Sequence, residues 1–230
     1  MCFSTEASFG AGIVLSVIGV ATIKQAQSPS SYFFSSLPII FALQQFSEGF
    51  LWLALSHAYF APLQQITTYV FLFLAQIIWP VLVPFSILLL EKNEKRKVAL
   101  RTILWVGILL ALYLGYCLIN YNVEAKIDGY HIAYQQDYPP SLISYVAISY
   151  IIATIAPAFF STVKKMKILG FAILISSVLA AIFYKNYLLS VWCFFASIIS
   201  ILVYVIVNQN KKIMIKNFSK SVQFYRTTDV

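Results

Sequence analysis

One apolar stretch, residues 33–57, carries Gln44, Gln45 and Glu48 near its middle. The stretch is long and apolar enough to cross a bilayer as a helix. A carboxylate at membrane depth is costly, so it marks either a functional site or a buried structural contact. Helical spacing places Trp52 on the same stripe as Gln44 and Glu48. The pattern predicts a polar site on one face of a membrane-spanning helix, with Glu48 at its floor.

Further polar and aromatic side chains fall at a similar depth when each predicted span is counted from its centre. Together with the first group they form the predicted ligand-binding set, which is Gln44, Gln45, Glu48, Trp52, Gln76, Trp79, Tyr113, Tyr150 and Trp192. The polar atoms concentrate in one half of the predicted bundle, and the other half is dominated by Ile, Leu, Val and Phe. This asymmetry predicts an outward-facing polar and aromatic cavity.

Apart from His57 at the very end of its own stretch, Glu48 has no Lys, Arg or His in the same half of any predicted span. A buried carboxyl group needs a cation or several hydrogen-bond donors to stay ionised. Glu48 is therefore either protonated or held by donors from Gln, Tyr and Trp side chains. Two interpretations stay open: a structural acid that shares hydrogen bonds with Gln44 and Gln76, and a carboxyl that exchanges protons or binds a ligand.

The chain starts Met1-Cys2-Phe3-Ser4. Removal of the methionine would leave an N-terminal cysteine, whose amine and thiol can act as a nucleophile or bind a soft metal. The alternative is a small apolar plug at the start of the helix. The sequence has only two histidines, His57 and His131, so a three-histidine zinc site is excluded. The remaining metal candidates are Cys2, His57 and His131, and no cofactor is predicted.

The composition is that of a membrane protein. Of the 230 residues 60% are hydrophobic and only 10% charged, and the mean hydropathy is +0.82. A soluble domain has about 25% charged residues. The net charge of +8 does not indicate nucleic acid binding, because the basic residues fall in short runs between apolar segments.

The predicted fold is all-α, a bundle of seven transmembrane helices that fills residues 1–208. The spans are expected near residues 8–24, 33–57, 66–90, 102–120, 140–162, 167–184 and 187–208. With the N-terminus outside and the C-terminus inside, all of the 16 Lys and Arg residues except Lys126 and Lys185 are cytoplasmic. The positive-inside rule favours this orientation. A retinal protein is disfavoured, because the seventh span lacks a lysine for a Schiff base.

Three local patterns refine this picture. Pro80 and Pro84 predict a kink in the third span, because proline frees backbone carbonyls that then need new partners.

Asp128-Gly129 lies between two alternating runs and predicts a type I′ β-hairpin over the outer mouth of the bundle, as a structural cap or a lid. Val123, Ala125 and Ile127 are expected to share a face with Tyr130, Ile132 and Tyr134. Residues 209–230 form a predicted cytoplasmic, basic amphipathic tail suited to anionic inner-leaflet lipids.

Two motifs resemble a known family. The start Met1-Cys2-Phe3-Ser4-x-x-Ala7-Ser8 and the run Leu43-Gln44-Gln45-x-x-Glu48-Gly49 are similar to those of a family of uncharacterised bacterial integral membrane proteins. Members typically begin Met-Cys-Phe-Ser-Ala-x-Ala-Ser, and Thr5 departs from that pattern. The resemblance implies a multi-pass protein of the bacterial inner membrane. It also implies that the N-terminal motif and the Gln-Gln-x-x-Glu-Gly helix belong to one site.

Two function classes follow. The first is a sensor, receptor or transporter that binds a small ligand or cation in the outward-facing cavity. The second is a membrane-embedded enzyme with Glu48 as general acid or base and Cys2 as a candidate nucleophile. Binding is favoured over catalysis, because no base is placed near Cys2 and histidine is scarce. The sequence does not define an oligomeric state.

Overall fold

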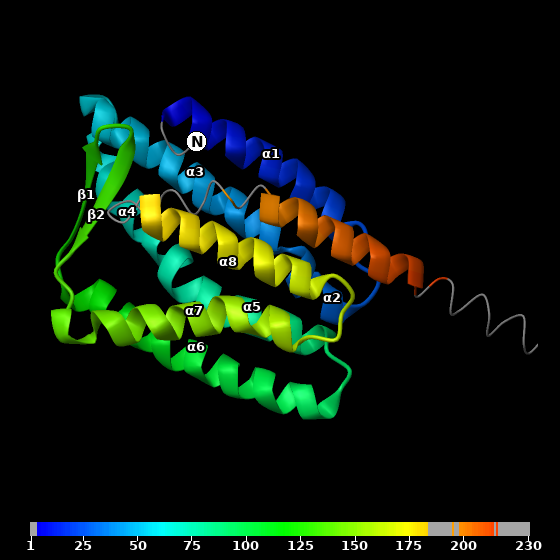
Figure 1. Ribbon diagram of the computed structural model, residues 1–230. Helices are drawn as coiled ribbons and strands as arrows, with labels where there is room; N and C mark the ends of the chain where they lie inside the picture. The colour runs from blue at the N-terminus through cyan, green and yellow to red at the C-terminus, as the bar shows by residue number, and fades with distance from the viewer. Residues whose placement is uncertain (1–3, 184–194, 196–197, 214, 216–230) are drawn as a thin grey trace, which may run out of the picture.

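The computed structural model describes residues 4–183, 195, 198–213 and 215, and these form a bundle of long helices with a β-hairpin across one end (Figure 1). The elements are α1 (Thr5–Ile23), α2 (Pro29–Ser35), α3 (Leu37–Ser56), η1 (Ala58–Leu63), α4 (Gln64–Leu72), η2 (Phe73–Ile78), α5 (Trp79–Leu90), α6 (Glu94–Asn120), β1 (Val123–Asp128), β2 (His131–Gln136), η3 (Pro140–Leu142), α7 (Ile143–Phe160) and α8 (Met166–Phe183). The segment 198–213 is also helical.

Six helical stretches in the described part of the chain are long and apolar enough to cross a membrane. They are Thr5–Ile23, Pro29–Ser56, Ala58–Leu90, Glu94–Asn120, Pro140–Phe160 and Met166–Phe183. These stretches overlap the first six predicted spans. The predicted seventh span, 187–208, lies partly outside the described residues, and so does most of the predicted tail, 209–230. The membrane-protein class is therefore supported, while the number seven and the orientation stay predictions.

Helix α1 packs along α3 through glycines. A Cβ atom at Gly12 would come within 2.9 Å of the Phe46 ring, and one at Gly19 within 2.5 Å of Ile39. A Cβ atom at Gly49 on α3 would lie 3.2 Å from the Phe9 ring on α1. Small residues let two membrane helices approach closely, which increases their van der Waals contact. This contact fixes the helix that carries Gln44, Gln45 and Glu48.

The third span departs from α-helical geometry just before its first proline. Residues Phe73–Ile78 form a π-helix, which continues as α5. In a π-helix the N–H of residue 80 would bond to the carbonyl of Ala75, but proline has no N–H. The hydroxyl of Tyr150 on α7 donates to that carbonyl instead, at 2.5 Å. The expected irregularity is thus a π-helix whose free carbonyl is satisfied by a neighbouring helix.

The β-hairpin is confirmed, but its turn lies one residue later than predicted. Asp128 pairs with His131, so the two turn residues are Gly129 and Tyr130. Gly129 has φ +61, and Tyr130 has no positive φ, which fits a type II′ turn and corrects the predicted type I′. Ala125 now pairs with Tyr134. With Asp128 and Gly129 in the turn it would have paired with Ile132. A shift of two residues keeps each side chain on its predicted face.

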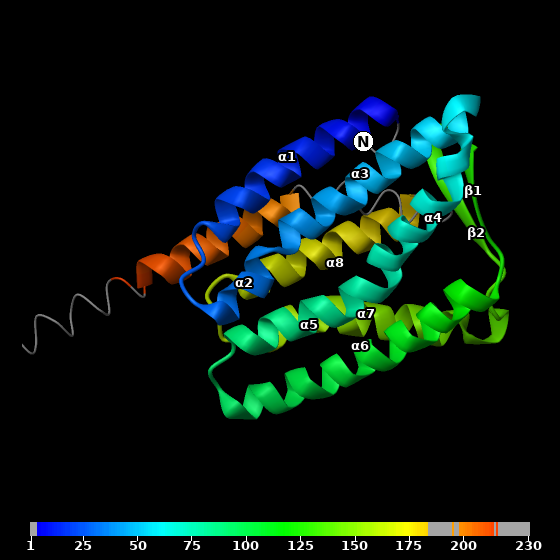
Figure 2. The same ribbon diagram turned by 180° about the vertical axis from the view of Figure 1, so that it is seen from behind.

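The buried face of the hairpin rests on α3 and α4. Ala125 and Ile132 pack against Leu51 and Trp52, and the Tyr134 ring stacks on Phe71 with centroids 4.7 Å apart. Both views show the hairpin crossing the end of the bundle, from the ends of α3 and α4 toward the ends of α6 and α7 (Figures 1 and 2). The hairpin therefore connects two groups of helices as a cap.

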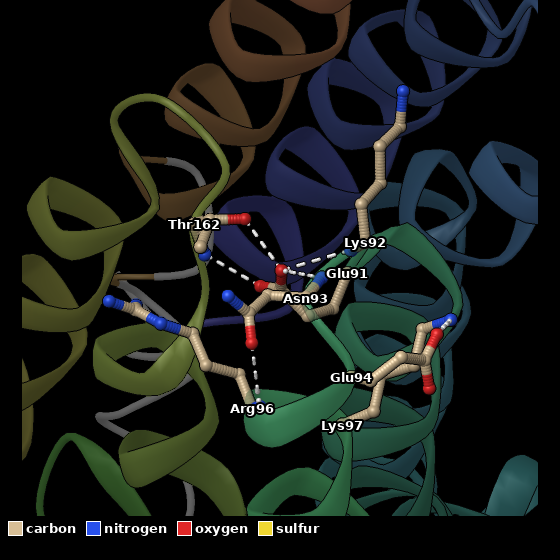
Figure 3. Close-up of polar contacts among 7 residues, drawn as sticks. All are labelled: Glu91, Lys92, Asn93, Glu94, Arg96, Lys97 and Thr162. Atoms are coloured by element: carbon tan, nitrogen blue, oxygen red, sulfur yellow. Dashed lines mark hydrogen bonds and ion pairs between the residues drawn. The ribbon is translucent and has the colours of Figure 1, made fainter.

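Glu91 ties the opposite end together. Its Oε1 atom accepts from the backbone N–H groups of Lys92 and Asn93, both at 2.9 Å, and from the hydroxyl of Thr162 at 2.6 Å. Its Oε2 atom accepts from the backbone N–H of Thr162 at 2.6 Å (Figure 3). Burial alone would raise the pKa of this carboxyl, but the hydrogen bonds from Thr162, Asn93 and Lys92 outweigh burial and lower the pKa to about 2. One carboxylate thus joins the α5–α6 and α7–α8 connectors.

Candidate functional site

Gln44 and Trp79 form a direct link between α3 and α5. The indole Nε1 donates to Gln44 Oε1 at 2.7 Å, and the indole stacks on Phe41 with ring centroids 3.9 Å apart. Both residues line a cavity of about 70 Å³ whose other walls are mainly apolar. Small-molecule sites usually occupy roughly 300–1,000 Å³. This cavity is too small for such a ligand, and the pair serves as a buried cross-link.

Glu48 and Gln45 are completely enclosed by protein, with 0% and 1% of their surface exposed. Gln45 Nε2 donates to Glu48 Oε2 at 3.4 Å. Glu48 therefore points into the bundle and not to lipid, as the cost of a carboxylate at membrane depth leads one to expect. The residue before Glu48 is Ser47. Its hydroxyl donates to the Thr67 carbonyl at 3.0 Å, which links α3 to α4. Glu48 is not among the residues that line the small cavity or the larger one described below.

Trp52 lies near the C-terminal end of α3, under the hairpin. It is 6% exposed and packs with Leu51, Ala125 and Ile132. Its indole Nε1 is buried and has no hydrogen-bond partner in the described part of the chain. Trp52 therefore serves the α3–hairpin contact and lies apart from the Gln44–Trp79 link.

Gln76, on the π-helix, forms hydrogen bonds with two residues at the end of the hairpin, Gln136 and Tyr138. Gln76 Nε2 donates to Gln136 Oε1 at 3.0 Å, and the hydroxyl of Tyr138 donates to Gln76 Oε1 at 3.2 Å. Burial raises the pKa of Tyr138, so its hydroxyl remains a donor at neutral pH. Gln136 Nε2 is buried and makes no hydrogen bond within the described residues. Within the described residues, the Gln136 amide nitrogen is therefore the donor of this network that has no acceptor.

A cavity of about 500 Å³ lies beside this network. Its walls come from α6, α7, α8 and the segment after β2. The lining residues are Gln76, Tyr113, Leu114, Gln136, Tyr138, Pro139, Ile143, Val146, Ala147, Tyr150, Ile151, Leu174, Ser177, Val178 and Ala181. Several α7 and α8 side chains on its wall are exposed, among them Ile143 at 57%, Ile151 at 48% and Val178 at 47%. The cavity is thus apolar and open on the α7–α8 side, with polar groups gathered near Gln76.

Of the predicted ligand-binding set, Gln76, Tyr113 and Tyr150 meet in this cavity. Tyr150 also lines the small cavity and so lies between the two. Gln44, Trp79, Gln45, Glu48 and Trp52 lie elsewhere on α3 and α5, as described above. Trp192 and Cys2 lie outside the described residues.

Gln136 and Tyr138 are part of the cavity but were not among the predicted residues. Their position follows from β2. The strand ends at Gln136, and the residues that follow it lie against the helices that form the cavity. The alternation of the hairpin indicated the strand but not its endpoint. No local pattern marked these two side chains.

The two histidines are separate from the cavity. His57 is exposed at the C-terminal end of α3, and His131 is half-buried on β2, where burial lowers its pKa. In the part of the chain that the structure describes, no three His, Cys, Asp or Glu side chains come together in a group that could hold a metal ion.

Comparison with known proteins places the chain in an uncharacterised group. Residues 1–217 match the profile of a family of unknown function, DUF6629. No protein with curated annotation and no solved structure matches the chain. The match agrees with the resemblance to an uncharacterised family.

Proposed function

The chain belongs to DUF6629, a family of unknown function, and from its geometry we propose that it binds a small, largely apolar molecule with a polar end. The proposed site is the 500 Å³ cavity between α6, α7, α8 and the end of β2. The observation that carries the proposal is the Gln76–Gln136–Tyr138 network at the edge of an otherwise apolar cavity. Binding sites typically combine apolar walls with a few convergent polar groups.

The polar end of the ligand is a hydrogen-bond acceptor such as a carbonyl oxygen. Gln136 Nε2 is a buried donor without a partner among the described residues, and a buried unpaired donor costs about 1–3 kcal/mol. A small rotation of the Gln136 amide would present this donor to a ligand oxygen. The Tyr113 and Tyr150 rings provide aromatic wall on the same cavity. The size of the cavity falls within the usual range for small ligands.

The proposal includes the setting of the site. The hairpin end is assigned to the outer face of the bacterial inner membrane, as the basic residues of the connectors indicate. The exposed α7 and α8 side chains on the cavity wall then face the outer half of the bilayer, so an apolar ligand can enter sideways from the lipid. This path favours a sensor or receptor of membrane-soluble molecules over a carrier of ions.

Thermal shifts of the purified full-length protein test the proposal. Medium-chain ketones, esters and amides are the probes, and at least one class is expected to raise the melting temperature in a saturable way. Ala147→Trp places an indole in the cavity and should abolish the shift. Ile148→Trp is the matched control, because Ile148 is the neighbouring α7 residue, is 58% exposed and does not line the cavity. Equal responses of the two variants would rule out this cavity as the binding site.

A further inference from the structure

A second large cavity lies at the end of the bundle opposite the hairpin. Its volume is about 440 Å³. Four parts of the chain form it: the α1–α2 connector with the start of α2, the end of α5 with the α5–α6 connector, the α7–α8 connector and the helical segment 198–213. The lining residues are Gln25, Gln27, Ser28, Ser30, Ser31, Leu89, Leu90, Lys92, Thr162, Val163, Lys164, Val207, Asn210, Lys211 and Ile213.

The charge of this cavity is positive. Lys92, Lys164 and Lys211 come from three separate segments, and no acidic side chain is among the described lining residues. The ion pairs found in the described part of the chain, Lys97–Glu94 and Lys126–Glu124, involve none of them. Lys211 Nζ donates to the neutral amide oxygen of Gln25 at 3.0 Å, which positions the ammonium without cancelling its charge. The cavity therefore favours an anion.

One carboxylate, that of Glu91, hydrogen-bonds to the lining residue Thr162. Glu91 precedes Lys92, but its two oxygens accept the four hydrogen bonds from Lys92, Asn93 and Thr162. Figure 3 shows the Lys92 side chain extending away from the Glu91 carboxylate. Lys92 thus contributes its charge to the cavity. The ionised Glu91 offsets one positive charge at the cavity edge, and the three lysines still leave the site with a net charge of +2.

The rest of the lining divides into a polar part and an apolar part. Ser28, Ser30 and Ser31 supply hydroxyl groups, and the Ser28 and Ser30 oxygens lie 2.9 Å apart. Leu89, Leu90, Val207 and Ile213 supply an apolar wall. Amines and hydroxyls beside an aliphatic surface match a molecule with an anionic head and a hydrocarbon chain.

We propose that this cavity binds the phosphate group of an anionic phospholipid. Phosphate offers several acceptor oxygens to converging ammonium groups, for which lysine is a common partner in proteins. The aliphatic wall favours a lipid over a soluble phosphate, because it can pack against the acyl chain. The sequence predicted lipid attraction only for the tail 209–230. Lys92 and Lys164, which come from two connectors, turn a general attraction into a defined site. The proposal does not depend on the 500 Å³ cavity, which lies at the hairpin end of the bundle.

Native mass spectrometry of the full-length protein in detergent tests this site. The probes are dioctanoyl phosphatidylglycerol and, as the neutral counterpart, dioctanoyl phosphatidylcholine. The pocket variant carries Lys92→Gln, Lys164→Gln and Lys211→Gln. The control variant carries Lys95→Gln, Lys167→Gln and Lys212→Gln, which removes the same charge from exposed lysines that do not line the cavity.

The pocket variant is expected to bind phosphatidylglycerol at least about tenfold more weakly, since each lysine near an anionic headgroup contributes severalfold. The control variant should change less than about twofold, and replacement of the three pocket lysines by arginine should retain binding. If the pocket variant does not fold, lipid binding is measured on the single variants Lys92→Gln and Lys164→Gln instead. Both side chains are exposed, so these variants should fold. Equal losses in the pocket and control variants would overturn the site. Displacement of the lipid by millimolar inorganic phosphate would overturn the lipid assignment in favour of a soluble phosphate.

Discussion

Gly107 on α6 lies directly against the carbonyl oxygen of Pro80 on α5. A Cβ atom at position 107 would overlap this oxygen, well inside the 3.0 Å that real Cβ atoms keep from other atoms. Pro80, the second residue of α5, is therefore a point at which the backbones of α5 and α6 approach closely. This contact holds the segment that carries Gln76 and Trp79.

Gly107→Ala is expected to destabilise the protein by about 1–3 kcal/mol, because the added methyl forces α5 and α6 apart. Gly115→Ala on the same helix is the control, since its Cβ would meet only Ile77 Cδ1 at an ordinary 3.4 Å. Thermal unfolding in detergent measures both. A Gly107→Ala variant as stable as the Gly115→Ala variant would contradict the described contact.

Glu91→Gln is expected to destabilise the end opposite the hairpin by about 1–3 kcal/mol at neutral pH, because it weakens the hydrogen bonds from Thr162 and Asn93. The lowered pKa of Glu91 sets the pH dependence. The stabilisation is fully present above the ordinary value of 4.5 and is lost as the pH falls toward 2. The melting temperatures of wild type and Glu91→Gln should therefore converge in acid. Glu94→Gln, at an exposed carboxylate, should follow wild type throughout.

Gly129→Val should disrupt the hairpin turn, because a β-branched residue is strained at φ +61. Gly129→Asn should be tolerated better than Gly129→Val, since asparagine is common after glycine at the positive-φ positions of primed turns. Protease cleavage within residues 123–136 reports the difference. A Gly129→Val variant that resists cleavage as well as Gly129→Asn would show that the turn does not order the strands.

Glu48→Gln should keep the fold, because the amide preserves the shape and can still accept from Gln45. Glu48→Leu removes the acceptor and leaves a buried donor unpaired, with an expected loss of about 1–3 kcal/mol. Unfolding measurements separate the two. Ligand shifts at the 500 Å³ cavity should survive Glu48→Gln, since Glu48 does not line that cavity. A lost ligand response in a folded Glu48→Gln protein would return Glu48 to the binding site.

The orientation is tested by cysteine labelling from outside the cell. In a background without reactive native cysteines, Asp128→Cys in the hairpin should react with an impermeant maleimide. Lys95→Cys, near the start of α6, should react only after permeabilisation. The reverse pattern would invert the assignment of both cavities.

The sequence alone predicted the membrane class, the hairpin and seven spans, of which six overlap helices in the described part of the chain, because these depend on local properties. Apolar length predicts a span, alternation with a glycine turn predicts a hairpin, and proline predicts an irregular helix. The inward orientation of Glu48 also followed from local reasoning, since a carboxylate facing lipid would lack partners.

Tertiary structure decided which polar residues meet. Depth along each span predicted one polar layer, but the rotation of each helix is set by packing with its neighbours. Gln44 therefore turned toward Trp79, while Gln76 turned toward Gln136 and Tyr138. The same holds for Lys92, Lys164 and Lys211, which come from three segments far apart in sequence. Partners contributed by distant segments leave no local pattern, so only the fold brings them into one cavity.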